Sequence, residues 1–382
     1  MERLAWTTGV GFLPYSGNLD MRPSQVLVSG VSGPELTNDE IHLFRKIQPG
    51  GFILFTRNIV DPWQTRQLTD SLRDLCEETP LIAIDNEGGR VWRTAPFSPA
   101  CPSAAVLGRL NKPKLIAEAG WITGRLLSIL GINLNLAPVL DLDHHPGSSN
   151  ALNGRCWGAF EQDVINHAGV FNRWQRRQGI AGCAKHFPCG GRAAVDPHHT
   201  LPTVQIDQEE ILREDIIPYT ALMPELDAIM VSHLHFPQID RNGLPASLSS
   251  NIIKRLLRDR LGFDHQLVLT DDLDMGAIQQ TYGTPEAARM SIEAGGDLVL
   301  LCHQFMNAEE SIAQLEKISP SMFYDIEIRI ERAKKRLKIP PPYSEEAFAT
   351  IMRDLSTLRE SVPLEESEHG SGENPASPVE NY

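Results

Sequence analysis

The stretch Gly182-Cys183-Ala184-Lys185-His186-Phe187-Pro188 is an apolar run that ends in a basic pair. Seven more short apolar runs recur along the chain, at 25–29, 51–56, 81–85, 132–140, 228–234, 267–271 and 297–302. Each has the length and continuous apolar character of a parallel strand that is buried on both faces. Segments with helical periodicity, such as 115–130 and 207–222, separate most of the runs. Eight strands alternating with helices over roughly 300 residues predict an α/β fold, a (β/α)8 barrel of the TIM type.

An open, doubly wound sheet is the alternative arrangement for this alternation. Its nucleotide-binding form is disfavoured, because no Gly-x-Gly-x-x-Gly follows the first run and no Gly-x-x-x-x-Gly-Lys occurs. Local signals support the helices. Thr37 and Glu40 have the spacing of a capping box, and Ser249 or Ser250 can cap a helix over 252–261 that Gly262 ends.

The chain is predicted to hold a single catalytic domain with short additions at both ends. Residues 1–22 are expected to form an N-terminal extension, and residues 23–340 the barrel. The prolines at 340–342 end the last long helix, because proline cannot continue one. Residues 341–363 are expected to be a C-terminal helical segment. Residues 364–382 contain glutamates but no Lys or Arg, which predicts a disordered acidic tail.

Composition narrows the class of protein and its partners. The chain has 382 residues and a formal net charge of -14, which argues against nucleic acid and anionic membranes as partners. Its six cysteines are scattered without a Cys-x-x-Cys pair, so neither a zinc ribbon nor a disulfide framework is expected. The start does not resemble a signal peptide, and no apolar run approaches the ~20 residues needed to cross a bilayer. A cytoplasmic monomer without metal or cofactor is expected.

Asp271 follows the run 267–270 and is a candidate nucleophile, since a strand-end carboxylate can attack an anomeric carbon. Successive side chains on a strand alternate, so Asp271 and Asp272 can both face the barrel mouth only if the chain has turned. The alternative is that Thr270-Asp271-Asp272 caps the next helix.

His198 is a candidate acid/base, because a histidine titrates near neutral pH. Asp196 could hold one of its ring nitrogens and fix the tautomer. A surface histidine without a role, or a metal ligand beside His199, are the alternatives. Metal is disfavoured because two adjacent side chains diverge.

Other polar residues at strand ends are candidates for sugar binding. Lys185, His186 and Arg155 could donate to hydroxyls, an N-acetyl carbonyl or a carboxylate, and Asp85 could accept from two adjacent hydroxyls. His233 and His235 alternate onto one face of their predicted strand. Metal binding is open for this pair, but a structural or pocket-wall role is favoured.

Several motifs in order resemble the family 3 glycoside hydrolases, in their bacterial β-N-acetylglucosaminidase branch. They are Gly51-Phe52-Ile53-Leu54-Phe55 with Arg57-Asn58, Asp85-Asn86-Glu87-Gly88-Gly89-Arg90-Val91 with Arg93, Leu136-Ala137-Pro138-Val139-Leu140-Asp141, Arg155, Lys185-His186-Phe187-Pro188 with Asp196-x-His198, and Thr270-Asp271-Asp272-Leu273 with Met275. Three features depart from the family pattern. Cys189-Gly190-Gly191 replaces Gly-His-Gly, Pro197 stands between Asp196 and His198, and Asn86 replaces Gln.

The resemblance implies a (β/α)8 barrel and a retaining two-step mechanism without metal. It implies that Asp271 is the nucleophile, that His198 is the acid/base and that Asp196 is its partner. It assigns sugar binding to Asp85, Arg93, Arg155, Lys185 and His186. The expected activity is that of a retaining exo-β-N-acetylglucosaminidase that removes terminal, non-reducing β-linked N-acetylhexosamine, with peptidoglycan fragments as one source.

Two alternatives to this activity stay open from the sequence. One is a β-glucosidase of the same family, and the other is a sugar-binding protein with reduced or lost turnover. Because a histidine base carries no negative charge, phosphate in place of water is a side hypothesis. The expected partner is a carbohydrate that contains N-acetylglucosamine.

Overall fold

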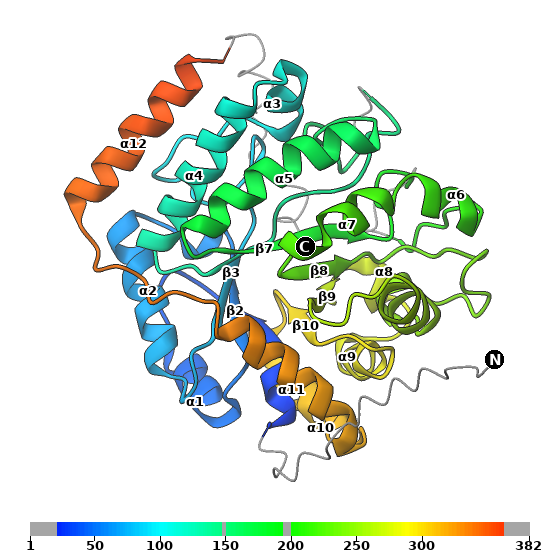
Figure 1. The fold of residues 1–382 in the computed structure, drawn as a ribbon. Helices are drawn as coiled ribbons and strands as arrows, with labels where there is room; N and C mark the ends of the chain where they lie inside the picture. Colours follow the sequence, from blue (N-terminus) through cyan, green and yellow to red (C-terminus); the bar gives the residue numbers. More distant parts are fainter. Residues whose placement is uncertain (1–20, 147–149, 194–199, 363–382) are drawn as a thin grey trace, which may run out of the picture.

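The computed structural model describes residues 21–146, 150–193 and 200–362. In this part of the chain, eight parallel strands close into a barrel in the order β1-β10-β9-β8-β7-β6-β3-β2. They are β1 Leu27–Gly30, β2 Gly51–Leu54, β3 Leu81–Ile84, β6 Leu134–Asn135, β7 Ala181–Phe187, β8 Ala228–Val231, β9 Leu267–Asp272 and β10 Leu298–Leu301. Figure 1 shows the strands at the centre with helices around them. The predicted (β/α)8 barrel is confirmed.

Amphipathic helices bury the outer face of the barrel. The α-helices of the described residues are α1 Asn38–Ile47, α2 Pro62–Asp74, α3 Ala104–Leu110, α4 Pro113–Ile129, α5 Glu161–Arg177, α6 Gln208–Arg213, α7 Ile217–Leu222, α8 Gly276–Gln279, α9 Thr284–Glu293, α10 Ala308–Leu315, α11 Pro320–Lys334 and α12 Glu345–Glu360. The capping box predicted for α1 is confirmed, because the side chains of Thr37 and Glu40 each accept from the other's backbone N–H. A π-helix, η5 Asn251–Arg260, occupies the helix predicted at 252–261.

Two sequence predictions of local structure are wrong in extent, and proline is the reason in both. The segment 207–222 forms the two short helices α6 and α7, because Pro218 has no N–H and its ring would clash with the carbonyl of Glu214 in a continuous helix. In the run 132–140, the strand β6 covers only two residues, and Val139 adds an isolated bridge to Lys185. Pro138, which follows a cis peptide bond, cannot donate to a strand ladder.

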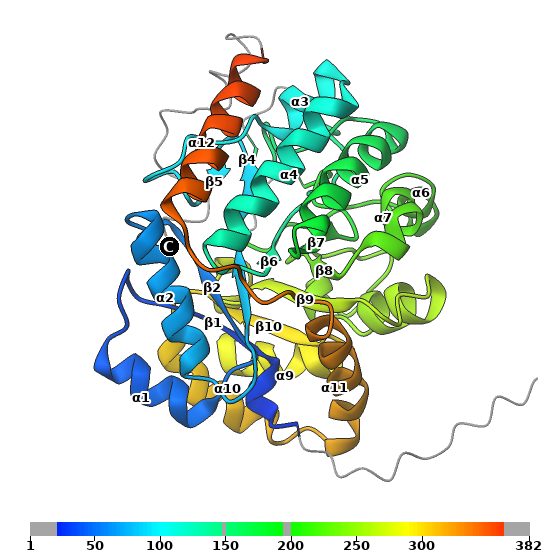
Figure 2. The same cartoon turned by 60° about the vertical axis from the view of Figure 1, so that its left-hand side comes forward.

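Two further elements accompany the barrel, a hairpin that follows β3 and a helix that lies beside α4. A small antiparallel hairpin, β4 Asn86–Gly88 and β5 Val91–Trp92, directly follows β3. The helix α12 lies along α4, and Arg125 of α4 is 2.7 Å from Asp354 of α12 (Figure 2). Among the described residues, no helix has both the length and the apolar character that crossing a membrane requires.

Candidate active site

One pocket lies at the carboxyl ends of the strands, where a barrel of this type holds its active site. Residues of the barrel interior, among them Ile53, Leu136, Met230 and Leu300, contribute to its apolar lining. Six of the residues predicted from the sequence line it together, namely Asp85, Arg93, Arg155, Lys185, His186 and Asp271. The other two, Asp196 and His198, lie outside the described residues. Ala193, which precedes them in the chain, also lines the pocket.

Strand irregularities bring neighbouring side chains into this pocket. In β7, the pairing with β8 advances three residues, from Ala184 to Phe187, while β8 advances two. In β9, the pairing with β10 likewise advances three residues, from Leu269 to Asp272, while β10 advances two. Each strand therefore carries one extra residue, which breaks the alternation of its side chains. As a consequence, one pocket is lined by both Lys185 and His186, and by both Asp271 and Asp272. Strict alternation of side chains would have placed only one residue of each pair there.

A buried set of alternating charges forms one wall of the pocket. Lys185 Nζ lies 2.6 Å from both Asp85 Oδ1 and Glu87 Oε1. Arg155 donates two hydrogen bonds of 2.8 Å to the Glu87 carboxylate. Burial alone would raise the pKa of Glu87, but the charges of Arg155 and Lys185 outweigh it and hold that pKa well below its usual range. Burial likewise would lower the pKa of Lys185, and the nearby carboxylates raise it instead. Both cations are therefore held charged at fixed positions.

Glu87 is a residue of the site that sequence reasoning missed. A signal was present, because it stands two residues after Asp85 in a motif that was already singled out. It lies in the hairpin strand β4 and is buried. The neighbouring Asn86, a departure from the family pattern, has a structural place. Its Oδ1 accepts from the backbone N–H of Arg93 at 2.8 Å, and its Nδ2 donates to Thr94 Oγ1 at 3.1 Å.

Arg93 reaches the pocket from the end of this hairpin. Its side chain is buried, and its Nη2 lies 3.5 Å from Asp85 Oδ2. Its guanidinium carbon is 5.5 Å from the centre of the Phe55 ring, and that of Arg57 is 4.6 Å from the same ring. Phe55 also lines the pocket, so cation–π contacts support the Arg93 side of the site.

A second missed residue, Asp141, orients His186. Its Oδ2 lies 2.7 Å from His186 Nδ1 and accepts from the His186 backbone N–H at 3.1 Å, while its Oδ1 accepts from the backbone N–H of Gly190. Because a carboxylate oxygen can only accept, Nδ1 of His186 donates this hydrogen bond, and the Nε2 atom of a neutral His186 is left as an acceptor. His186 can therefore accept from a ligand hydroxyl.

Gly190, which departs from the family pattern, and Gly191, which keeps it, both pack closely on Asp141 and Leu142. A Cβ atom on Gly191 would lie 2.0 Å from the backbone oxygen of Leu142, and one on Gly190 would lie 2.9 Å from Asp141 Oδ2. Such approaches are too close for any side chain. Cys189 is buried beside them. Gly190 and Gly191 thus allow the chain after Pro188 to pack closely on the segment that orients His186.

Asp271 is the more accessible of the two adjacent carboxylates at the end of β9. Its Oδ1 accepts from the backbone N–H of Asp272 at 2.9 Å. Asp272 is buried, and its Oδ1 accepts from the backbone N–H groups of Asp274 and Cys302. Burial, with the charge of Asp274 as a smaller cause, raises the pKa of Asp272 well above its usual range. The alternative that this segment caps a helix is wrong, because the next helix, α8, follows Met275 and has no side-chain cap.

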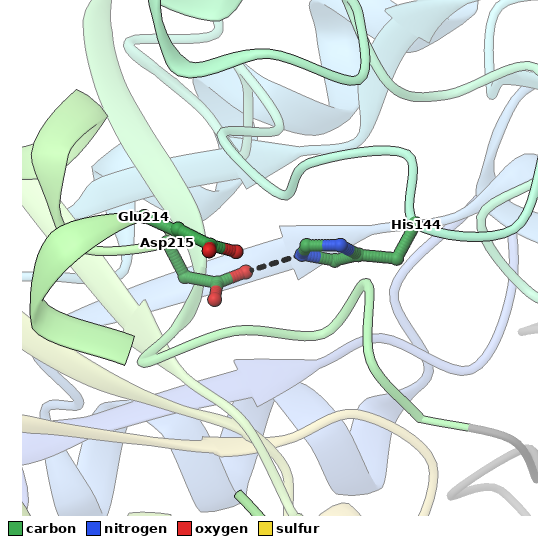
Figure 3. Close-up of side chains that lie close together, drawn as sticks. All are labelled: His144, Glu214 and Asp215. Carbon is green, nitrogen blue, oxygen red and sulfur yellow. Dashed lines mark hydrogen bonds and ion pairs between the residues drawn. The ribbon is translucent and has the colours of Figure 1, made fainter. Parts of the chain in front are cut away.

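A second polar cluster joins His144, Glu214 and Asp215 (Figure 3). His144 Nε2 lies 2.8 Å from Asp215 Oδ1. Arg192 donates to the other oxygen of Asp215 at 2.7 Å and also pairs with Glu214. Because the Arg192 guanidinium pairs with both carboxylates, the cluster is an ion-pair network that joins the segment after β7 to the region of α6 and α7.

Comparison with known proteins places the chain in a family. A family model described as the glycosyl hydrolase family 3 N terminal domain matches residues 19–335. The chain belongs to this family. The resemblance drawn from its motifs is therefore confirmed at the level of the family.

Relatives and solved structures agree with this membership. A beta-hexosaminidase from Pseudomonas aeruginosa is 32% identical over 293 residues, which cover 76% of this chain and 86% of that protein. One from Bordetella parapertussis is 34% identical over 330 residues, covering 83% and 90%. The structure of a family 3 beta-N-acetylglucosaminidase from Paenibacillus has a TM-score of 0.81 at 31% identity, covering 89% of this chain and 68% of that one. NagZ from Neisseria gonorrhoeae, in complex with N-trifluoroacetyl-D-glucosamine, has a TM-score of 0.74 at 26% identity, covering 88% and 98%.

Proposed function

We propose that this chain is a retaining exo-β-N-acetylglucosaminidase that removes terminal β-linked N-acetylhexosamine. The convergence of the six described candidate residues on one pocket carries the proposal. The names of the beta-hexosaminidase relatives and of the family 3 beta-N-acetylglucosaminidase structure support the choice of sugar. A pocket with apolar barrel residues in its lining and charged groups around it suits a single terminal sugar ring.

In the proposed mechanism, Asp271 attacks the anomeric carbon and forms a covalent glycosyl-enzyme. Protonated His198 gives its proton to the leaving oxygen, and neutral His198 then takes a proton from the water that attacks the intermediate. Asp196 holds the His198 ring in one tautomer. The hydroxyls of the sugar bind Asp85, Lys185 and His186.

Arg155 and Arg93 complete the binding site of the proposed enzyme. Arg155 is fixed in place by its two bonds to Glu87, and its Nη2 lies 3.5 Å from His186 Nε2. A guanidinium held in this way can donate to the N-acetyl carbonyl without first losing side-chain freedom. Arg93, beside Asp85, can donate to a neighbouring hydroxyl.

Replacing Asp271 with Ala should abolish the release of nitrophenol from nitrophenyl β-N-acetylglucosaminide. Replacing His198 with Ala should spare an activated leaving group far more than a poor one, because only the poor one needs the proton. Near-normal turnover of the Asp271→Ala variant, on a substrate with an activated or a poor leaving group, would refute the assignment of the nucleophile. The folded state of both variants is checked by their melting temperature.

A small panel of substrates separates the remaining alternatives. The proposal expects a much larger kcat/KM for the N-acetylglucosaminide than for the nitrophenyl β-glucoside, whereas a β-glucosidase would reverse that order. Saturable binding of N-acetylglucosamine without turnover would favour a sugar-binding protein. Repeating the assay with phosphate tests phosphorolysis through formation of a sugar phosphate. Release of N-acetylglucosamine from peptidoglycan fragments tests that source. A monomer and a cytoplasmic location stay predictions.

A further inference from the structure

His233 belongs to a motif that the proposed mechanism does not use. It lies two residues beyond the end of β8, and its side chain is fully buried. Its Nδ1 is 2.7 Å from Ser247 Oγ, and its Nε2 is 2.9 Å from the backbone oxygen of Asp272. A backbone oxygen can only accept, so Nε2 carries the proton. Nδ1 of the neutral ring then accepts from the Ser247 hydroxyl. These two bonds leave the ring no role as one of a pair of metal ligands with His235.

No residue of strand β8 itself donates to the Asp272 backbone oxygen that His233 binds, because this oxygen lies beyond the last pair of β8 with β9. The last pair between β8 and β9 is Val231 with Thr270, so β9 continues past the end of its neighbour. This oxygen also accepts from the backbone N–H of Met275 at 3.1 Å, within the turn that follows β9. His233 adds a second donor, which comes from the continuation of β8 and ties the oxygen to the neighbouring strand. His233 thereby prolongs the contact between the two strands beyond the irregularity in β9.

The residue held in this way is the one that contacts the proposed nucleophile. The Asp272 backbone N–H donates to Asp271 Oδ1 at 2.9 Å. The Asp272 side chain is held from the other side by the backbone N–H groups of Asp274 and Cys302, at 2.9 and 3.3 Å. Asp272 is therefore fixed through its backbone oxygen and through its carboxylate. Its N–H can then present one constant direction to Asp271.

We infer that His233, supported by Ser247, is a positioning residue for Asp271. It holds Asp272 so that the Asp272 N–H fixes one oxygen, and with it the orientation, of the Asp271 carboxylate. This inference rests on the proposed role of Asp271 as nucleophile. Since reacting atoms must meet within narrow limits, a displacement of about 1 Å can lower a rate by about a hundredfold.

Two substitutions of His233 separate the hydrogen bond from the bulk of the ring. In His233→Gln, the side-chain amide nitrogen lies near the former Nε2 and can still donate to Asp272. In His233→Asn, the shorter side chain reaches Ser247 but not Asp272. We expect His233→Asn to lower kcat at least about tenfold, with KM nearly unchanged, because the sugar-binding residues are untouched. His233→Gln should recover most of that loss. Formation of the glycosyl-enzyme, followed by mass spectrometry with a slow fluorinated substrate, should slow in the same order.

His235 is the matched control. It lies two residues further along the chain, and its ring contacts Thr203 Oγ1 at 3.5 Å and the backbone oxygen of Asp240 at 3.2 Å. His235→Gln should keep wild-type kcat and KM. If His233→Asn does not fold, Ser247→Ala decides, because it frees the ring to rotate and should lower kcat severalfold without a change in KM.

Wild-type kcat in a folded His233→Asn variant, or equal losses in the Asn and Gln variants, would overturn the inference. So would a rise in KM at constant kcat, which would indicate a change in sugar binding. The Asp271→Ala variant separates this failure from failure of the proposed function. If that variant is inactive while His233→Asn is normal, only the positioning role is wrong. If it is active, the proposed nucleophile is wrong and the positioning role falls with it.

Discussion

Replacing Glu87 with alanine removes the carboxylate that two buried cations share. Arg155 loses both of its 2.8 Å hydrogen bonds to Glu87, and Lys185 loses a contact of 2.6 Å. The three side chains are between 3% and 7% exposed, so water cannot replace the lost partner. Removing one partner of a buried ion pair costs about 3–5 kcal/mol. Lys185 keeps Asp85, and Arg155 keeps the backbone oxygen of Ala151, so the lower end of this range is expected.

The corresponding change in melting temperature follows from the size of the chain. At about 2.1 cal/mol/K per residue, an unfolding entropy of roughly 0.8 kcal/mol/K is expected for 382 residues. A loss of about 3 kcal/mol should then lower the melting temperature by about 4 °C. Calorimetry with urea unfolding measures both quantities. The same variant should also lose kcat/KM, because Arg155 and Lys185 are no longer held in place.

Two variants control this experiment. Glu87→Gln keeps the shape but not the charge and should cost less than Glu87→Ala. Glu209→Ala removes an exposed carboxylate, 3.5 Å from Arg260, and should change the free energy of unfolding by less than about 0.5 kcal/mol. If the free energy of unfolding of Glu87→Ala lies within about 1 kcal/mol of the wild-type value, the claim that this ion-pair network is desolvated is refuted.

The effect of pH provides an independent check on the same residue. The pKa of Glu87 is lower in the folded protein than its ordinary value of 4.5. The stability that the folded protein gains from this ionised carboxylate is therefore present above pH 4.5 and is lost as the pH falls further. The difference in free energy of unfolding between wild type and Glu87→Ala should be constant from neutral pH down to about pH 5, and should shrink in more acid solution.

Two further predictions concern residues outside the lining of the pocket. Burial, with a smaller contribution from Arg57, lowers the pKa of His303 from 6.5 to about 4. Between these two pH values the unfolded chain therefore binds more protons than the folded protein, so the free energy of unfolding should fall as the pH falls from 6.5 to 4. Urea unfolding of His303→Gln should show a smaller fall in this free energy across the same range. Gly191→Ala should lower both the melting temperature and kcat, because its Cβ would lie 2.0 Å from the backbone oxygen of Leu142. Gly33→Ala is the control and should leave both unchanged, because a Cβ there meets no atom within 4 Å. Equal behaviour of the two alanine variants would contradict the packing argument.

Much of the architecture could be predicted because its signals are local. The apolar runs predicted the barrel strands, and the spacing of Thr37 and Glu40 predicted the start of α1. The errors in the fold also have local causes, since Pro138 and Pro218 interrupt elements that periodicity alone extended. The polar residues at strand ends predicted the place of the site, because the carboxyl ends of parallel strands meet at one face of the barrel.

The partners within the site could not be predicted in this way. Asp141 and Glu87 were visible as acidic residues, but nothing near them in the sequence shows that one orients His186 and the other binds Arg155. The pocket-facing pairs Lys185-His186 and Asp271-Asp272 depend on one extra residue in each strand. An extra residue is defined only by the register with the neighbouring strand, so a single segment does not reveal it.

The sequence by itself determined the barrel, the family and the set of charged residues at the mouth, because apolar periodicity and motif order are properties of the chain. Only the tertiary structure decided which of these charges pair. Lys185 and Asp85 are 100 positions apart, Arg155 and Glu87 are 68 apart, and His233 and Asp272 are 39 apart. Electrostatic and hydrogen-bond energies depend on distances of a few ångströms. Barrel closure and strand register set those distances, and both closure and register arise only when the whole chain folds.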